Sequence, residues 1–168
     1  MIEIITSLSF QVIIFFLISL IMNALVNWQL RKITPLIDLS HIAVIIAKGT
    51  LFISFALLLT ELSETFIPLK NVLSIKLSGS ELYQELVIYL SAFTAIILVL
   101  EFICFFMSWL LYSLVSSSKG LFIEISRDNY HAVLLFSLIF IAFTLFMKAE
   151  MVSILDYLIP YSTATTFQ

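Results

Sequence analysis

The feature that most constrains this chain is a thirty-residue stretch, from Leu86 to Val115, that contains a single charge. The hydrocarbon core of a bilayer is about 30 Å thick, and about 20 apolar helical residues cross it. The stretch is therefore long enough to span a membrane as a helix. Its charged residue, Glu101, then lies near the bilayer midplane, where an ionisable group costs about 2.5 to 3.5 kcal/mol on insertion scales. We expect another residue of the fold to offset this cost.

The composition of the whole chain is that of a protein with several membrane spans. Its 168 residues are 62% hydrophobic and 11% charged, which leaves no soluble domain of useful size. The 11 acidic and 8 basic residues form no run of either sign, so we expect no nucleic-acid partner. The one cysteine, Cys104, lies inside a span, where it can neither form a disulfide within the chain nor complete a metal site.

The apolar runs predict four membrane spans and hence an all-α fold, an integral membrane four-helix bundle. The spans cover residues 5–28, 41–60, 86–115 and 131–147, and an extension of the last span to residue 157 is the alternative. The whole chain, residues 1–168, is then a single transmembrane domain. We expect Asp38 or Ser40 to cap the second span, because a side-chain oxygen there can accept hydrogen bonds from the amides of the first helical turn.

The longest polar stretch covers residues 61–85. Apolar residues are interspersed there with Lys70, Asn71 and Lys76, and Pro68 is expected to end any helix that enters from the second span. This pattern predicts an interfacial segment on the membrane surface, with a loop packed over the bundle as the alternative.

Four spans place both termini on the same side of the membrane. The connections after the first and third spans hold more basic residues than the opposite side does: Arg31, Lys32, Lys119 and Arg127 against Lys70, Lys76 and Lys148. By the positive-inside rule, these connections are cytoplasmic and both termini are on the non-cytoplasmic side.

The candidate functional residues are the charges inside or next to the apolar spans, namely Lys48, Glu101, Lys148 and Glu150. Such residues mark a pathway or a partner contact by default, and a structural ion pair between helices is the alternative. Lys48 is the natural partner for Glu101, reached by helix tilt or through a bridging water. In that case Glu101→Gln leaves Lys48 uncompensated, and a further Lys48→Met exchange restores most of the lost stability.

Sequence motifs of enzymes are absent from the chain, which has no HExxH, no CxxC and no glycine-rich phosphate loop. His41 and His131 both begin spans, but histidines that hold a haem lie opposite one another inside a bundle rather than at its edge. The sequence therefore predicts a protein that is not an enzyme and that binds no cofactor and no metal.

The two halves of the chain share one plan. Placing Ala43-Val44 of DLSHIAVIIAKG over Ala132-Val133 of EISRDNYHAVLL aligns Ser40 with Asn129, and apolar runs follow in both halves. A duplication would give two tandem two-helix repeats in parallel orientation, and chance similarity between apolar helices is the alternative.

This arrangement resembles the DUF350 family of small bacterial inner-membrane proteins, in which a charged approach, an asparagine and an alanine-rich span occur in each of two repeats. EISRDNYHAVLL is the closer match, whereas DLSHIAVIIAKG has Ser40 in place of the asparagine, and the glycines of the family are nearly absent. The resemblance implies a four-span protein of the bacterial inner membrane and implies no activity, because the family is functionally obscure.

Two functions then stand as hypotheses. The first is a homo-oligomeric membrane assembly or channel with Glu101 facing its interior, because four short helices enclose too little volume for a polar path of their own. The second is an accessory subunit of a larger membrane complex, whose charged helix faces pair with another membrane protein. In both cases the lipid bilayer is a partner.

Overall fold

The computed structural model describes residues 2–33, 38–116 and 120–160, and their side chains except those of residues 2–11 and 63. It contains four long helices and one short one: α1 (Ile2–Ile33), α2 (Ile42–Ser74), α3 (Gly79–Val115), α4 (Leu121–Ser126) and α5 (Tyr130–Tyr157). No strand occurs in this part of the chain. Each of the four long helices is long and apolar enough to cross a membrane, which confirms the predicted all-α fold with four spans.

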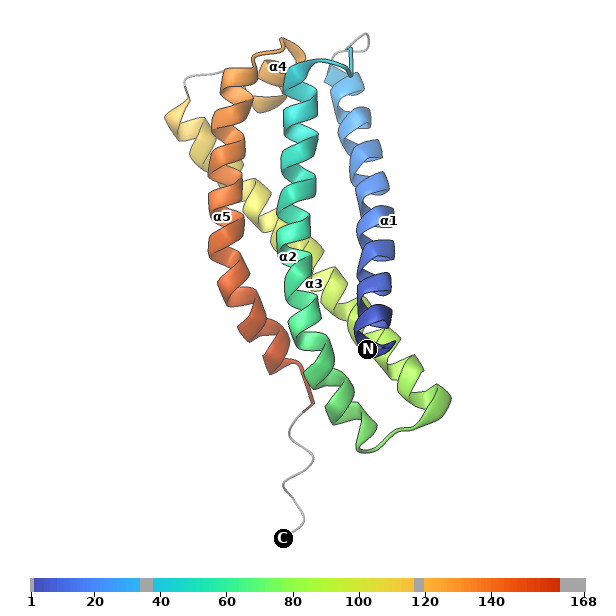
Figure 1. Cartoon of the computed structure of the whole chain (residues 1–168). Coiled ribbons are helices and arrows are strands. Elements are labelled where there is room, and N and C mark those ends of the chain that lie inside the picture. Colours follow the sequence, from blue (N-terminus) through green and yellow to red (C-terminus); the bar gives the residue numbers. More distant parts are fainter. Residues whose placement is uncertain (1, 34–37, 117–119, 161–168) are drawn as a thin grey trace.

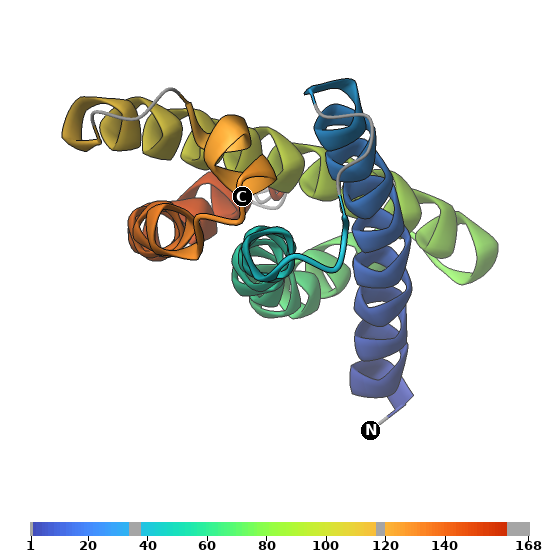
Figure 2. The same ribbon diagram turned by 90° about the horizontal axis from the view of Figure 1, so that it is seen from above.

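The long helices form a three-helix core with a fourth helix at its edge (Figures 1 and 2). Helices α2 and α5 run side by side in the same direction, and α3 crosses behind them in the opposite direction. Helix α1 stands beside α2, and the short α4 packs over the end of the bundle where α2 and α5 begin. Helix α1 starts and α5 ends toward the other end, as an even number of crossings requires.

The core sits between α2, α3 and α5, because each of these helices has one continuous buried face. On α3 the buried residues recur every three or four positions, which is the helical repeat: Leu86, Leu90, Phe93, Ile97, Leu100, Glu101, Cys104, Ser108 and Tyr112. Helix α1 differs, since 6% of its apolar span is buried inside the chain, against 28% to 44% for the other three spans. Most of residues 12–33 of α1 therefore face outward.

The expected helix break at Pro68 is wrong. Helix α2 continues through Pro68 to Ser74, and the chain turns before α3 begins at Gly79. The stretch 61–85 is thus shared between two long helices and does not form a separate interfacial segment. A proline inside a helix costs about 3 kcal/mol. Burial of Phe66, Leu69 and Leu73 in the core offsets this cost, since each buried side chain contributes about 1.5 to 3 kcal/mol.

The expected cap of α2 is also wrong. Asp38 Oδ1 accepts a hydrogen bond from the Ser40 backbone amide at 2.9 Å, which closes a local turn ahead of the helix. The Ser40 amide, and then the Ser40 hydroxyl, hold the pKa of Asp38 below its usual value. The first turn of α2 is capped from elsewhere, because the Ala43 amide donates to Asp128 Oδ1 at 2.8 Å.

Asp128 lies in the tight turn between α4 and α5. Its φ of 55° is in the left-handed region, which aspartate tolerates better than most residues. The next residue, Asn129, accepts from the Ala132 amide at the start of α5. Two consecutive residues thus cap α2 and α5 at Ala43 and Ala132, the positions that the repeat alignment places together. Lys119, one of the basic residues on which the expected orientation depends, lies outside the described residues.

Candidate functional site: a buried polar seam

The candidate site is a line of buried polar side chains in the core between α2, α3 and α5, which we call the polar seam. It consists of Thr50 and Ser54 from α2, Glu101 and Cys104 from α3, and Ser137 and Thr144 from α5. Each of these residues is at most 5% exposed. Because buried polar groups are costly in an apolar core unless they are hydrogen-bonded, their partners decide what the site can do.

Glu101 is bonded to a hydroxyl group. The Ser54 side chain is hydrogen-bonded to Glu101 Oε1, and the other carboxyl oxygen, Oε2, is buried without a hydrogen-bond partner. Ser54 Oγ also lies 3.1 Å from the Leu51 backbone carbonyl oxygen of its own helix. Glu101 itself is 4% exposed, so its carboxyl group is enclosed by the protein.

The expected ion pair between Lys48 and Glu101 is wrong. No hydrogen bond or ion pair joins Lys48 to any other described residue, and Ser54 takes its place beside Glu101. The reason is helix rotation. Six residues separate Lys48 from Ser54, which places them about 9 Å apart along the axis and about 120° apart around it. Lys48 therefore lies on a different side of α2 and remains partly exposed.

A second predicted charge, Lys148, forms an ion pair with a residue outside the predicted set. Lys148 Nζ of α5 lies 2.9 Å from Glu61 Oε1 of α2, with the lysine side chain 34% exposed and the glutamate side chain 5% exposed. The sequence pattern places Glu61 in the predicted interfacial segment. The sequence nevertheless contains a signal for Glu61. Polar residues recur on one face of this helix at intervals of four, seven and four residues, namely Thr50, Ser54, Glu61 and Thr65. The fourth predicted charge, Glu150, is exposed.

The remaining members of the polar seam tie the helices together. Thr50 Oγ1 lies 2.8 Å from Ser137 Oγ, a bond between α2 and α5. The Cys104 thiol interacts with the Thr144 hydroxyl and lies near the Glu101 carboxyl group. Ser137 and Thr144 also donate to carbonyl oxygens of their own helix, as hydroxyl groups in membrane helices commonly do. These contacts leave Glu101 as the seam residue with an unpartnered oxygen.

Comparison with protein-family models, with curated proteins and with solved structures finds no match to this chain.

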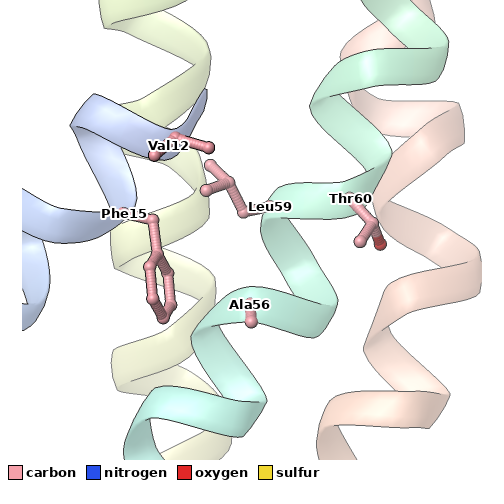
Figure 3. Close-up of a pocket in the computed structure, with 5 residues that line it drawn as sticks. All are labelled: Val12, Phe15, Ala56, Leu59 and Thr60. Carbon is pink, nitrogen blue, oxygen red and sulfur yellow. The ribbon is translucent and has the colours of Figure 1, made fainter. Parts of the chain in front are cut away.

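Outside the seam, the surface carries an apolar hollow of about 170 Å³ between α1 and α2 (Figure 3). Val12 and Phe15 line it from α1, and Ala56, Leu59 and Thr60 line it from α2. Its one hydroxyl group, on Thr60, donates to the Leu57 carbonyl. The lining therefore offers apolar packing and no convergent polar groups, which suits a lipid chain better than a polar ligand.

Nor do the described histidines converge on a site. His131 stacks on Tyr130 with ring centroids 4.0 Å apart, whereas His41 Nδ1 is buried without a hydrogen-bond partner at the start of α2. No group of three metal-ligating side chains occurs within residues 2–33, 38–116 and 120–160. Among the described residues three carboxyl groups are buried: Glu61 is paired with Lys148, Glu124 accepts from Asn129, and Glu101 has one oxygen without a partner.

Proposed function

We propose that this protein is a subunit of a homo-oligomeric membrane assembly, in which copies associate through the outer face of α1. The observation that carries the proposal is the position of Asn23 and Asn27. Both are partly buried at the border between the side of α1 that contacts α2 and its outward side. Asn27 Oδ1 is buried and has no hydrogen-bond partner in the described part of the chain.

The outward residues beside these asparagines have the spacing of a helix-packing surface. Ile13, Phe16 and Leu20 are each more than half exposed. Together with Asn23 and Asn27 they recur at intervals of three, four, three and four residues, the repeat by which one helix packs along another. We call these five residues the α1 seam. In coiled coils, a polar residue at one such position selects the register and the number of strands.

A second copy of the same chain suits the α1 seam because an amide side chain both donates and accepts hydrogen bonds. Copies inserted in one orientation bring the same residue to the same depth, so Asn23 of one copy meets Asn23 of the next. Within the chain, Asn27 Nδ2 lies 3.5 Å from Asn23 Oδ1, at the outer limit for a hydrogen bond. Asn23 Nδ2 has no partner among the described residues and is not among their buried unpartnered atoms, so it can donate to a neighbour. Such polar contacts hold membrane helices together.

A channel is one form that such an assembly could take, and the structure bears on where its pore would lie. Glu101 is enclosed inside each bundle, so the expectation that it faces an interior between copies is wrong. A pore in the assembly would instead lie between the subunits. The further proposals that accompany this one are a location in the bacterial inner membrane, membership of the DUF350 family, termini on the non-cytoplasmic side, and the absence of enzymatic activity.

The alternative, an accessory subunit of a larger complex, is favoured by Lys48. This cation lies seven residues into an apolar helix, or about 10 Å from its start, without a partner among the described residues. A different membrane protein with a carboxylate at that depth would complete an ion pair there.

Native mass spectrometry in mild detergent tests the proposal. We expect the wild-type chain to appear as several copies, and the Asn23→Leu, Asn27→Leu double variant to dissociate. Each lost hydrogen bond between membrane helices costs about 0.6 to 1.7 kcal/mol, so the double exchange weakens association about tenfold or more.

The matched control is Ser91→Leu, another polar-to-apolar exchange on the outside of the bundle, where the Ser91 hydroxyl bonds its own helix. It should leave the mass distribution unchanged. A wild-type chain that is monomeric in mild detergent would refute the homo-oligomer. Stoichiometric co-purification with a different membrane protein, lost in Lys48→Met, would establish the alternative.

A further inference from the structure

We propose that Glu101 is a buried proton-binding site, at which the carboxyl group holds a proton and donates it to Ser54, while Ser54 donates its own hydrogen to the Leu51 carbonyl. This inference concerns the inside of one bundle and does not depend on how copies associate. It rests on three observations: the hydrogen-bond geometry at Ser54, the enclosure of the carboxyl group, and the positions of the surrounding charges.

The hydroxyl group of Ser54 has two hydrogen-bond acceptors next to it but only one hydrogen to donate. Ser54 Oγ is in contact with two acceptors, the Leu51 carbonyl oxygen and Glu101 Oε1, and a hydroxyl group carries one hydrogen. If Glu101 is ionised, the two contacts must share that one hydrogen, which weakens both. If Glu101 carries a proton, both contacts are hydrogen bonds in a series that runs from Glu101 through Ser54 to Leu51.

The enclosure of Glu101 favours the same state. The residue is 4% exposed, and Oε2 is buried without a hydrogen-bond partner. An ionised carboxylate in an apolar interior needs hydrogen bonds or a cation to both oxygens, whereas a neutral carboxyl group needs far less. Ile97 and Leu100, which precede Glu101 on the buried face of α3, supply neither.

The charges on the packed helices do not provide a counterion. On α3 itself the neighbouring titratable group is the Cys104 thiol. On α2, Lys48 and Glu61 lie six and seven residues from Ser54, or about 9 to 10 Å along the axis in opposite directions. On α5, Lys148 is paired with Glu61. Within the described part of the chain, a proton is therefore what neutralises Glu101.

A proton also fits the contact better than a metal ion. Ser54 lies directly against the carboxyl group, which leaves no room for an ion between the two oxygens. Sodium and similar hard cations need several oxygen ligands, and Ser54 is the hydrogen-bonding partner that the structure gives this carboxyl group. When the site releases its proton, the O–H bond of the carboxyl group breaks and the proton passes to hydroxide in the surrounding water.

Infrared spectroscopy of the purified protein tests this proposal, because the carbonyl stretch of a protonated carboxyl group is resolved from the bands of carboxylates. With glutamate labelled by ¹³C at the side-chain carboxyl, we expect a protonated glutamate band at pH 7 that disappears reversibly at alkaline pH. Glu101→Gln should remove the band, while Glu150→Gln, at an exposed site, should retain it. Ser54→Ala should keep the band and move it to higher frequency, since the hydrogen bond to Ser54 is lost.

Several outcomes would overturn the proposal. These are the absence of a protonated band in the wild type at pH 7, a band that survives Glu101→Gln, and a band that vanishes when NaCl is added at constant pH. The last result would identify a cation site instead. We expect Glu101→Gln to melt at the wild-type temperature, because a neutral amide replaces a neutral acid. If Glu101→Gln fails to fold, two measurements still test the proposal: the pH titration of the wild-type band, and the frequency of that band in Ser54→Ala.

Discussion

At the residue scale, the four intramembrane charge candidates have four different environments. Glu101 is enclosed against Ser54, and Lys148 is paired with Glu61. Lys48 is partly exposed and unpaired within the described residues, and Glu150 is exposed. Sequence pattern finds such residues because a charge in an apolar run is conspicuous. It does not find their partners, since Ser54 is an unremarkable residue in such a run and Glu61 lies where a polar loop was expected.

The ion pair between Glu61 and Lys148 leads to an asymmetric prediction. Lys148→Met leaves the enclosed Glu61 carboxylate without its cation. Breaking a fully buried pair in this way costs about 3 to 5 kcal/mol, and we expect a smaller loss here because one partner is partly exposed. Glu61→Gln should cost less, because the Lys148 side chain is 34% exposed and its charge can reach outward. The double variant should recover most of the loss caused by Lys148→Met. Unfolding in mixed detergent micelles measures all three, and equal, additive losses would contradict the pairing.

At the element scale, the starts of two of the three core helices, α2 and α5, depend on residues from the turn between α4 and α5. Asp128 caps α2 at Ala43, and Asn129 caps α5 at Ala132. Asn129 Nδ2 also donates to Glu124 Oε2 of α4 at 2.7 Å. This turn therefore fixes the beginnings of two parallel helices relative to each other. Asn129 lies three residues before the amide that it caps, within the range of the local rule for caps, whereas Asp128 lies 85 positions from Ala43 and is outside that range.

We predict that Asp128→Gly destabilises the protein by about 1 to 2 kcal/mol, because the Ala43 amide loses its cap. Glycine adopts a positive φ without strain, so this variant separates cap loss from backbone strain. Asp128→Asn keeps both the acceptor and the tolerance of positive φ, and it should be close to neutral. Hydrogen exchange should report faster exchange at residues 43–45 in Asp128→Gly alone. Equal exchange in the two variants would rule out the cap.

At the scale of the whole molecule, α2 and α5 keep a constant register along the bundle. Ser137 lies 87 positions after Thr50, and Lys148 lies 87 positions after Glu61, so the two contacts share one offset. The contacts are eleven residues apart, or about 16 Å. Two parallel helices thus stay aligned over half the thickness of a membrane. The parallel direction of the two helices agrees with the proposed two-helix repeats. The repeat alignment, which pairs Ala43 with Ala132, has an offset two positions larger than the offset of these contacts.

This register predicts a specific crosslink. In a Cys104→Ala background, Thr50→Cys with Ser137→Cys should form a disulfide within one chain under mild oxidation, because the two hydroxyl oxygens lie 2.8 Å apart. The control pair, Ile53→Cys with Leu138→Cys, replaces residues that are more than half exposed, and it should stay reduced within the chain. Gel mobility with and without reductant distinguishes the species. A crosslink in the control and none in the test pair would refute the arrangement of α2 and α5.

The sequence by itself determined that this protein is all-α and that it has four helices able to span a membrane, because span length and apolarity are local properties. It also placed Glu101 near the middle of the third span. The partners of the charges, the path of α2 through Pro68 and the long-range cap at Asp128 were decided by the tertiary structure. Each residue turns a helix by about 100°, so contact depends on the rotation and register of both helices. An apolar run fixes neither, and packing of the three core helices sets both.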